Sequence, residues 1–257
     1  MSRHADPHAK EALVAAARAE FARRGLRGAR IEDITAACGL SKGAFYLHFE
    51  SKEGLFGALV QAFVGEMGGA AGIRVSESME FFEREGSLVS ADFRKSSPRL
   101  QRWNELELAM DVRSLELMWR YRDVLDVLIS GCQGTPFEKT VWELVDAEQG
   151  RIAENHRQFQ CSGCLRSDVA PELFGAMVVG TYLLVGKQMA RAAEKPDLAS
   201  MARSLQTLIH EGSLPRDLAP LRRDQRPRAG SPKQPKSRVV KSSRKQLRTN
   251  ASARSSR

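Results

Sequence analysis

The chain has 257 residues, of which 42% are hydrophobic, so it is long and apolar enough to bury a sizeable core. This composition excludes global disorder, and four cysteines are too few for a disulfide-built fold of this length. The net charge of +9 is unevenly spread, because residues 222–257 hold 13 Lys/Arg and one Asp. Residues 1–56 carry a net +2 and residues 57–221 a net −5. Basic charge at the two ends favours contact with nucleic acid at an end of the chain.

The distribution of apolar residues argues against targeting and membrane segments. The start of the chain lacks an apolar signal-peptide core, and the longest apolar stretch, residues 176–185, is too short to cross a bilayer. We therefore expect a soluble, cytoplasmic protein without a membrane partner.

The first predicted helix begins at Pro7, where proline suits the first helical position and Asp6 can act as the N-cap. Gly25 is expected to end it. The apolar residues that recur every four positions along it are Leu13, Ala17 and Phe21.

Two short helices follow, separated by a tight turn. The first is predicted over Ile31–Ala37, and Gly39 supplies the left-handed conformation of the turn. Ser41 is a natural cap for the next helix, and Ser51 caps a further one whose apolar residues recur at helical spacing. This order of elements is typical of a helix-turn-helix at residues 31–49.

The rest of the chain is also helical in pattern. A run of glycines at residues 65–72 predicts a helix end or a hinge there. Further helices are expected at residues 75–89, 98–129, 136–160, 168–193 and 197–211. The fold class is therefore all-α, with a helix-turn-helix head (1–56), a helical regulatory and dimerisation body (57–221) and a disordered basic tail (222–257).

The head carries a resemblance to a known family. Residues 31–49, IEDITAACGLSKGAFYLHF, resemble the TetR family of repressors, and residues 50–56, ESKEGLF, extend the similarity. The resemblance implies a sequence-specific regulator of transcription that binds double-stranded operator DNA. The chain departs from the family at Arg30, where a hydroxyl residue is usual nearby, and at Thr35 and Cys38, where alanine is common.

Candidate DNA-binding residues follow from the chemistry of the predicted recognition helix, at about residues 41–49. Small Gly43 and Ala44 permit close approach to base edges, and Lys42 can reach phosphate or a guanine edge. The resemblance implies mainly backbone contacts for Tyr46 and His48. The remaining candidates are Arg30 and Lys52 for phosphate, Leu47 for a thymine methyl group and Ser41 at the cap.

A recognition helix this short buries too little surface alone, so a homodimer on a palindrome is expected. The resemblance implies dimerisation through the last two long helices, with room for close approach at Ala176, Gly180 and Gly186, although packing within one subunit explains these small residues as well. It also implies a small-molecule effector in the body. The aromatic and methionine residues that could line its site are more readily explained as core: Trp103, Met110, Met118, Trp119, Tyr121, Phe137 and Trp142.

No catalytic arrangement, cofactor motif or complete metal site stands out, so an enzyme is not expected. Cys161 and Cys164 invite a redox or metal role, but a lone pair cannot form a closed zinc site. Two alternatives to a regulator remain: an architectural DNA-binding protein in which the tail dominates, and a ligand-binding or enzymatic body with a vestigial head. The tail itself is expected either to add sequence-independent phosphate contacts or to be a solubilising extension.

Overall fold

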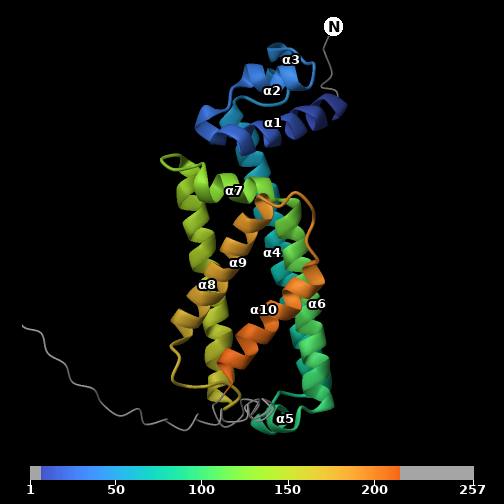
Figure 1. The fold of residues 1–257 in the computed structure, drawn as a ribbon, viewed down its shortest axis with the longest axis vertical. Helices are drawn as coiled ribbons and strands as arrows, with labels where there is room; N and C mark the ends of the chain where they lie inside the picture. The colour runs from blue at the N-terminus through green and yellow to red at the C-terminus, as the bar shows by residue number, and fades with distance from the viewer. Residues whose placement is uncertain (1–6, 215–257) are drawn as a thin grey trace, which may run out of the picture. The chain divides into compact units, whose positions relative to one another are not determined.

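The computed structural model describes residues 7–214, and the described part contains ten α-helices and no strand, which confirms the all-α prediction (Figure 1). The helices are α1 (Pro7–Gly28), α2 (Ile31–Ala37), α3 (Lys42–Tyr46), α4 (Lys52–Glu85), α5 (Ser90–Lys95), α6 (Pro98–Arg120), α7 (Arg122–Ser130), α8 (Pro136–Cys161), α9 (Pro171–Ala190) and α10 (Leu198–Ser213). The predicted cap Asp6 and the predicted disordered tail, 222–257, lie outside the described residues.

Helix α1 follows the sequence prediction closely. It begins at Pro7, and Gly25 interrupts it with φ 67° and ψ 172°, a backbone conformation that glycine adopts without steric cost. One more turn continues to Gly28, so the predicted end at Gly25 is a sharp change of direction within one element. The turn after Gly25 places the buried side chain of Leu26 in the core.

The glycine run at residues 65–72 lies inside helix α4, so the first of its two predicted roles, a helix end, is wrong. The helix runs for 34 residues from Lys52 to Glu85, straight through residues 65–72. Buried Phe63 anchors it before the glycines and buried Phe81 after them. Side chains of α6 also pair with it, since Arg74 Nη2 lies 2.5 Å from Asp111 Oδ1. Tertiary contacts on both sides of the run therefore maintain a helix that glycine weakens locally.

Two further boundaries differ from the sequence prediction. The segment expected at residues 75–89 is the end of α4, followed by Gly86 at φ 75° and the short helix α5, which was not predicted. The helix expected at residues 98–129 is divided at Tyr121 into α6 and α7. At α5, the buried Asp92 carboxylate accepts hydrogen bonds from Val89 N and Ser97 Oγ, at 2.9 and 2.7 Å, and so holds the turn together.

Helices α8 and α9 lie against each other with their backbones in close approach. A Cβ atom on Gly175 would lie 2.5 Å from the backbone oxygen of Gln149, so only glycine fits at that crossing. Gly186 packs inside the subunit, because a Cβ there would lie 2.9 Å from Met118 Cε, whereas a Cβ on Gly180 would meet open space. Among the small residues singled out on this helix, Gly180 is thus the glycine that leaves room on an open face.

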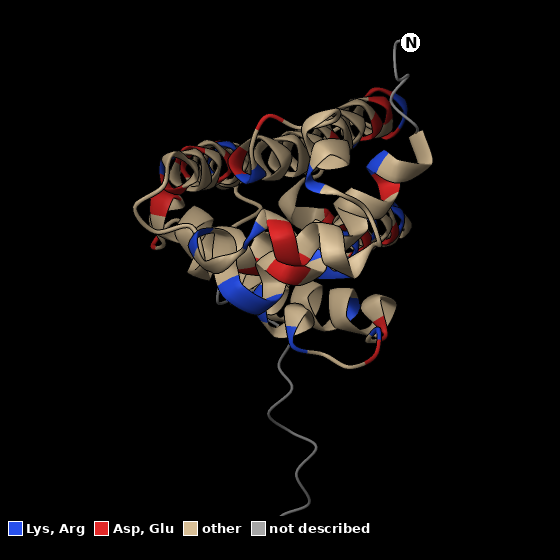
Figure 2. Ribbon diagram, turned by 90° about the horizontal axis from the view of Figure 1, so that it is seen from above, with Lys and Arg blue, Asp and Glu red and all other residues tan. Residues whose placement is uncertain are grey.

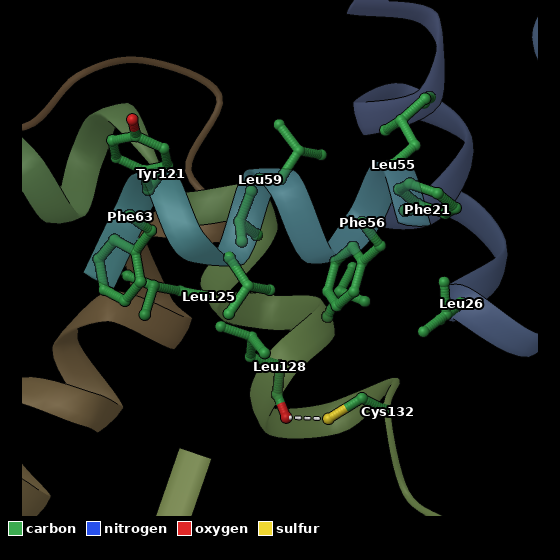
Figure 3. Close-up of a cluster of buried hydrophobic side chains, with 14 of the residues drawn as sticks. Phe21, Leu26, Leu55, Phe56, Leu59, Phe63, Tyr121, Leu125, Leu128 and Cys132 are labelled. Atoms are coloured by element: carbon green, nitrogen blue, oxygen red, sulfur yellow. Dashed lines mark hydrogen bonds between the residues drawn. The ribbon is translucent and has the colours of Figure 1, made fainter. Parts of the chain in front are cut away.

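One hydrophobic core joins the head to the neighbouring end of the body. Phe21 of α1 packs edge-on against Phe56 of α4, with ring centroids 5.3 Å apart, and Phe56 packs likewise against Phe137 of α8 at 5.1 Å. Side chains from α7 and from the turn that follows it complete this cluster, as Figure 3 shows for Leu125 and Leu128 of α7 and for Cys132 in the turn. A division between head and body at residue 56 remains a prediction, and both α4 and this core run across that position.

Helices α4 and α9 are the two described helices that have the length and apolar composition of a membrane span. In α4, one side contributes Leu55, Phe56, Leu59, Val60 and Phe63 to the core described above. In α9, Val178, Val179 and Met189 are buried within the chain. Their apolar character is accounted for in part by this internal packing.

The shared core gives a first prediction. Replacing Phe56 with alanine removes a ring that is fully buried between α1 and α8 and should lower the free energy of unfolding by about 3–5 kcal/mol, measured by denaturant titration. The matched control is Trp142→Ala on α8, because that ring is 59% exposed and should cost less than about 1 kcal/mol. Equal losses in the two variants would contradict a core centred on Phe56.

Candidate nucleic-acid interface

The turn between α2 and α3 is closed by local backbone hydrogen bonds. Gly39 N donates to Ala36 O at 3.2 Å, and Leu40 N donates to Thr35 O at 2.9 Å. Gly39 has φ 69°, so the left-handed turn predicted from the sequence is confirmed. Buried Thr35 donates its hydroxyl to Ile31 O at 3.0 Å, which satisfies the polar atom that distinguishes it from the usual alanine.

Helix α3 is anchored from below and capped at its start. Ser41 Oγ accepts a hydrogen bond from Ala44 N at 3.2 Å, as its predicted role as N-cap requires. Phe45 is fully buried, and its ring centroid lies 5.8 Å from that of Phe49, which is also buried. Because these two rings hold one side of the helix in the core, the opposite side faces outward.

The regular part of this helix is shorter than the predicted span of about residues 41–49. It covers Lys42–Tyr46, and Leu47 still has helical dihedral angles as its C-cap. Both His48 N and Phe49 N donate to Phe45 O, at 3.0 Å each, so the chain tightens and leaves the helix there. Only the first part of the predicted span is therefore presented as a helix.

The predicted DNA-binding residues fall into two groups by exposure. The first group is exposed and includes two large side chains, Tyr46, which is 57% exposed, and Leu47, which is 50% exposed. These two side chains are therefore available for contact at the end of α3. The other exposed candidates are Arg30, Ser41, Lys42 and Gly43, whereas Ala44, His48 and Lys52 are half-buried.

Lys42 does not stand free in this structure. Its Nζ forms an ion pair with Glu32 Oε1 on α2, and the hydrogen bond from Lys42 is the main reason that the pKa of Glu32 is lowered. Both side chains are more than half exposed, so the pair contributes little to stability and is readily exchanged. Contact between Lys42 and a phosphate would replace one anionic partner with another. No sequence pattern had indicated this pairing across the turn.

Lys52 ties the start of α4 to the segment between α1 and α2. Its Nζ donates to Ala29 O at 2.8 Å and to Arg27 O at 3.0 Å. The ammonium group thus satisfies two carbonyls at the end of α1 and fixes Arg30, which follows directly, near the start of α2. The sequence predicted a phosphate contact for Lys52 but gave no sign of this internal role.

The head surface carries charges of both signs. Arg30 is the N-cap of α2 and makes no side-chain cap bond, while Glu32 and Asp33 occupy the first turn of that helix. Seen from above, acidic and basic segments lie close together on this side (Figure 2). Anionic side chains in the first turn favour the helix dipole, but they oppose a nearby phosphate. Approach to DNA therefore depends on a few basic side chains rather than on a uniformly basic face.

The body offers no comparable site among its described residues. No group of three His, Cys, Asp or Glu within residues 7–214 is placed to hold a metal ion. Cys161 is exposed at the end of α8, whereas Cys164 is buried and its thiol donates to Leu88 O at 3.4 Å. Trp103 packs against the rings of Phe81 and Phe82 and belongs to a second, smaller core cluster.

Comparisons with known proteins agree with this geometry. Residues 13–59 match the family of bacterial regulatory proteins, tetR family. The chain is 41% identical over 56 residues to the uncharacterized HTH-type transcriptional regulator YerO of Bacillus subtilis (strain 168), which is 22% of this chain and 19% of the relative. It is 47% identical over 47 residues to the HTH-type transcriptional repressor DhaR of Mycobacterium sp. (strain GP1), which is 18% of this chain and 24% of the relative.

The likeness in sequence is thus confined to the head, and the aligned part spans about a fifth to a quarter of these relatives. The fold extends further. The solved structure of the ketosteroid transcriptional regulator KstR2 of Mycobacterium tuberculosis superposes with a TM-score of 0.61 and 17% identity, over 82% of this chain and 97% of that one. These named relatives are regulators and none is an enzyme.

The capped helix starts give a second prediction. Ser51 Oγ accepts a hydrogen bond from Gly54 N at 2.9 Å, so Ser51→Ala should lower the free energy of unfolding by about 1 kcal/mol. The control is Ser76→Ala on the exposed side of α4, which should change stability by less than about 0.5 kcal/mol because alanine favours a helix interior. A loss of the same size in both variants would show that the Ser51 cap has no particular role.

Proposed function

We propose that the chain is a dimeric, effector-responsive transcriptional repressor that binds a palindromic operator, because residues 13–59 match the tetR family of bacterial regulatory proteins. The observation that carries the proposal is α3, a capped helix anchored by buried Phe45 with Tyr46 and Leu47 exposed beside it. A helix presented in this way suits insertion into the major groove. We place the protein in the cytoplasm, where operator DNA is accessible.

Within this proposal the recognition surface divides into two kinds of contact. Gly43, Ala44 and Leu47 reach base edges, because they lie on or beside α3 away from its buried anchor, and Lys42 reaches a guanine edge or a phosphate. The residues that position the helix on the sugar-phosphate backbone are Arg30, Ser41, Tyr46, His48 and Lys52. Since few side chains read bases, specificity depends strongly on DNA shape and on the spacing of the two half-sites.

Two helices of the body carry exposed apolar side chains that suit a second copy of the chain. On α9, Leu173, Met177 and Leu184 are exposed at intervals of four and seven residues, which places them on one side of the helix. Gly180 falls on the same side, where it leaves open space for a facing helix. On α10, Leu208 is 72% exposed. We assign the dimer interface to these two helices.

Footprinting at physiological salt tests the proposed function as a whole. The wild-type protein should protect a discrete, two-fold symmetric site in DNA selected from a random pool, because two heads contact one operator. Diffuse coverage would instead favour an architectural DNA-binding protein. A folded protein that binds no DNA at all would favour a vestigial head.

A third prediction concerns Lys42. The variant Lys42→Ala should weaken binding to the selected site by about tenfold, and the slope of log affinity against log salt should fall by about 0.9 for each phosphate that the variant no longer neutralises. The control is Lys139→Ala on α8, whose side chain is 82% exposed and pairs with Glu143 one turn away. An unchanged affinity and salt slope in Lys42→Ala would remove Lys42 from the interface.

A fourth prediction concerns the dimer. The variant Leu184→Asp places a charge on a side chain that is 70% exposed in one protomer and should shift sedimentation from dimer to monomer at micromolar concentration. Trp142→Asp, on an exposed position of α8, should leave the assembly state unchanged. A Leu184→Asp variant that sediments as the wild type would move the interface away from this side of α9.

A further inference from the structure

One arginine of α1, Arg18, makes three hydrogen bonds to the body. Arg18 Nε donates to Asp123 Oδ2 at 2.7 Å, and Nη2 donates to Asp123 Oδ1 at 2.5 Å. The same Nη2 also donates to the backbone oxygen of Arg120 at 2.6 Å. The paired contact with the carboxylate fixes the plane of the guanidinium group as well as its distance. Arg18 thus binds both the end of α6 and the first turn of α7.

A residue of α4, Glu66, also binds the junction between α6 and α7, which we call the α6–α7 corner. Glu66 Oε2 accepts a hydrogen bond from Arg120 Nη1, and Glu66 Oε1 accepts one from the Tyr121 hydroxyl at 2.5 Å. The Tyr121 ring also packs against Phe63, with centroids 5.4 Å apart. Burial, followed by the hydrogen bond to Glu66, raises the pKa of Tyr121, so its hydroxyl remains a donor at physiological pH. Both of these hydrogen bonds of Glu66 go to Arg120 and Tyr121, and neither goes to α1.

The corner is the junction between two separate helices, α6 and α7. Tyr121 is both the C-cap of α6 and the N-cap of α7, with φ −105° and ψ 17°. Any change in the angle between these helices shifts the Arg120 carbonyl relative to the Asp123 carboxylate. Arg18 binds both groups, so it responds to that change.

We propose that Arg18 is a positioning residue of the DNA-binding head, and that the α6–α7 corner, steadied by Glu66, sets the angle at which the body holds the head. This assignment goes beyond the proposed function and rests on it only where operator spacing is concerned. A dimer places its two recognition helices at a fixed separation, so the angle of each head determines which half-site spacing is bound. The corner is therefore the place where a change in the body is passed to the heads.

The first test does not require DNA. Amide hydrogen exchange of the full chain should show faster exchange in α1 and in the corner for Arg18→Gln and also for Glu66→Ala, by about tenfold, with α8 and α9 unchanged. Two variants are matched controls. Arg23→Gln removes an arginine that pairs with Glu20 within α1, and Glu77→Ala removes a carboxylate of α4 that pairs with Arg113 of α6 away from the corner.

The second test separates positioning from a general loss of stability. Wild type should prefer the selected operator over one with the half-sites moved apart by one base pair, and this ratio should fall about fivefold in Arg18→Gln and Glu66→Ala, at the low end of typical coupling between sites. A purely structural weakening would lower both affinities equally and leave the ratio unchanged.

Each outcome decides the assignment. Loosening of α1 by Glu66→Ala, which removes hydrogen bonds to Arg120 and Tyr121 but none to α1, supports transmission through the corner. Normal exchange of α1 in that variant overturns it, even if Arg18→Gln is loosened. If the wild type binds no operator, the proposed function fails, while the exchange measurement still tests the link between corner and head.

Discussion

The burial of α1 against two sets of partners is the constraint on which the rest of the structure depends. Leu13, Ala17 and Phe21 complete the core of the helix-turn-helix, and the same helix lies against α7, where Arg18 pairs with Asp123. Phe56 extends this packing toward Phe137 on α8. A ring buried between helices contributes several kcal/mol, far more than an exposed ion pair. The hydrophobic contact therefore determines that head and body stay together, and polar contacts adjust how they are oriented.

This constraint also explains which groups remain for function. Phe45 and Phe49 must lie beneath α3 to complete the head, so the side that carries Lys42, Tyr46 and Leu47 is directed outward. Gly43 adds no side chain to that side, and the hydrogen bond from Ala44 N to Ser41 Oγ caps the start of the helix. The DNA-facing surface is thus a consequence of the core, and its chemistry is set by the few positions that the core does not use.

Local patterns in the sequence predicted the elements that depend on local physics. The boundaries of α2, the left-handed Gly39 and the caps Ser41 and Ser51 follow from side-chain spacing and backbone preference. The division of α6 from α7 at Tyr121 does not, because it is fixed by contacts with Glu66 and Phe63, which come from a distant part of the chain. For the same reason the sequence singled out Lys42 and Lys52 as candidates but did not indicate their partners Glu32, Arg27 and Ala29.

Helix α4 connects the head to the body, because its first residues pack in the head and its later residues pack in the body. Its glycines at 65, 68, 69 and 72 meet no neighbouring atoms where a side chain would begin, and each lowers helix stability by about 1 kcal/mol relative to alanine. Yet the weak stretch lies between firm attachments, since Phe63 is buried before it and Arg74 pairs with Asp111 after it. A helix held at both sides of a weak centre bends there first when its ends are displaced. In the proposed transmission through the α6–α7 corner, bending of α4 would therefore begin next to Glu66, where α4 meets that corner.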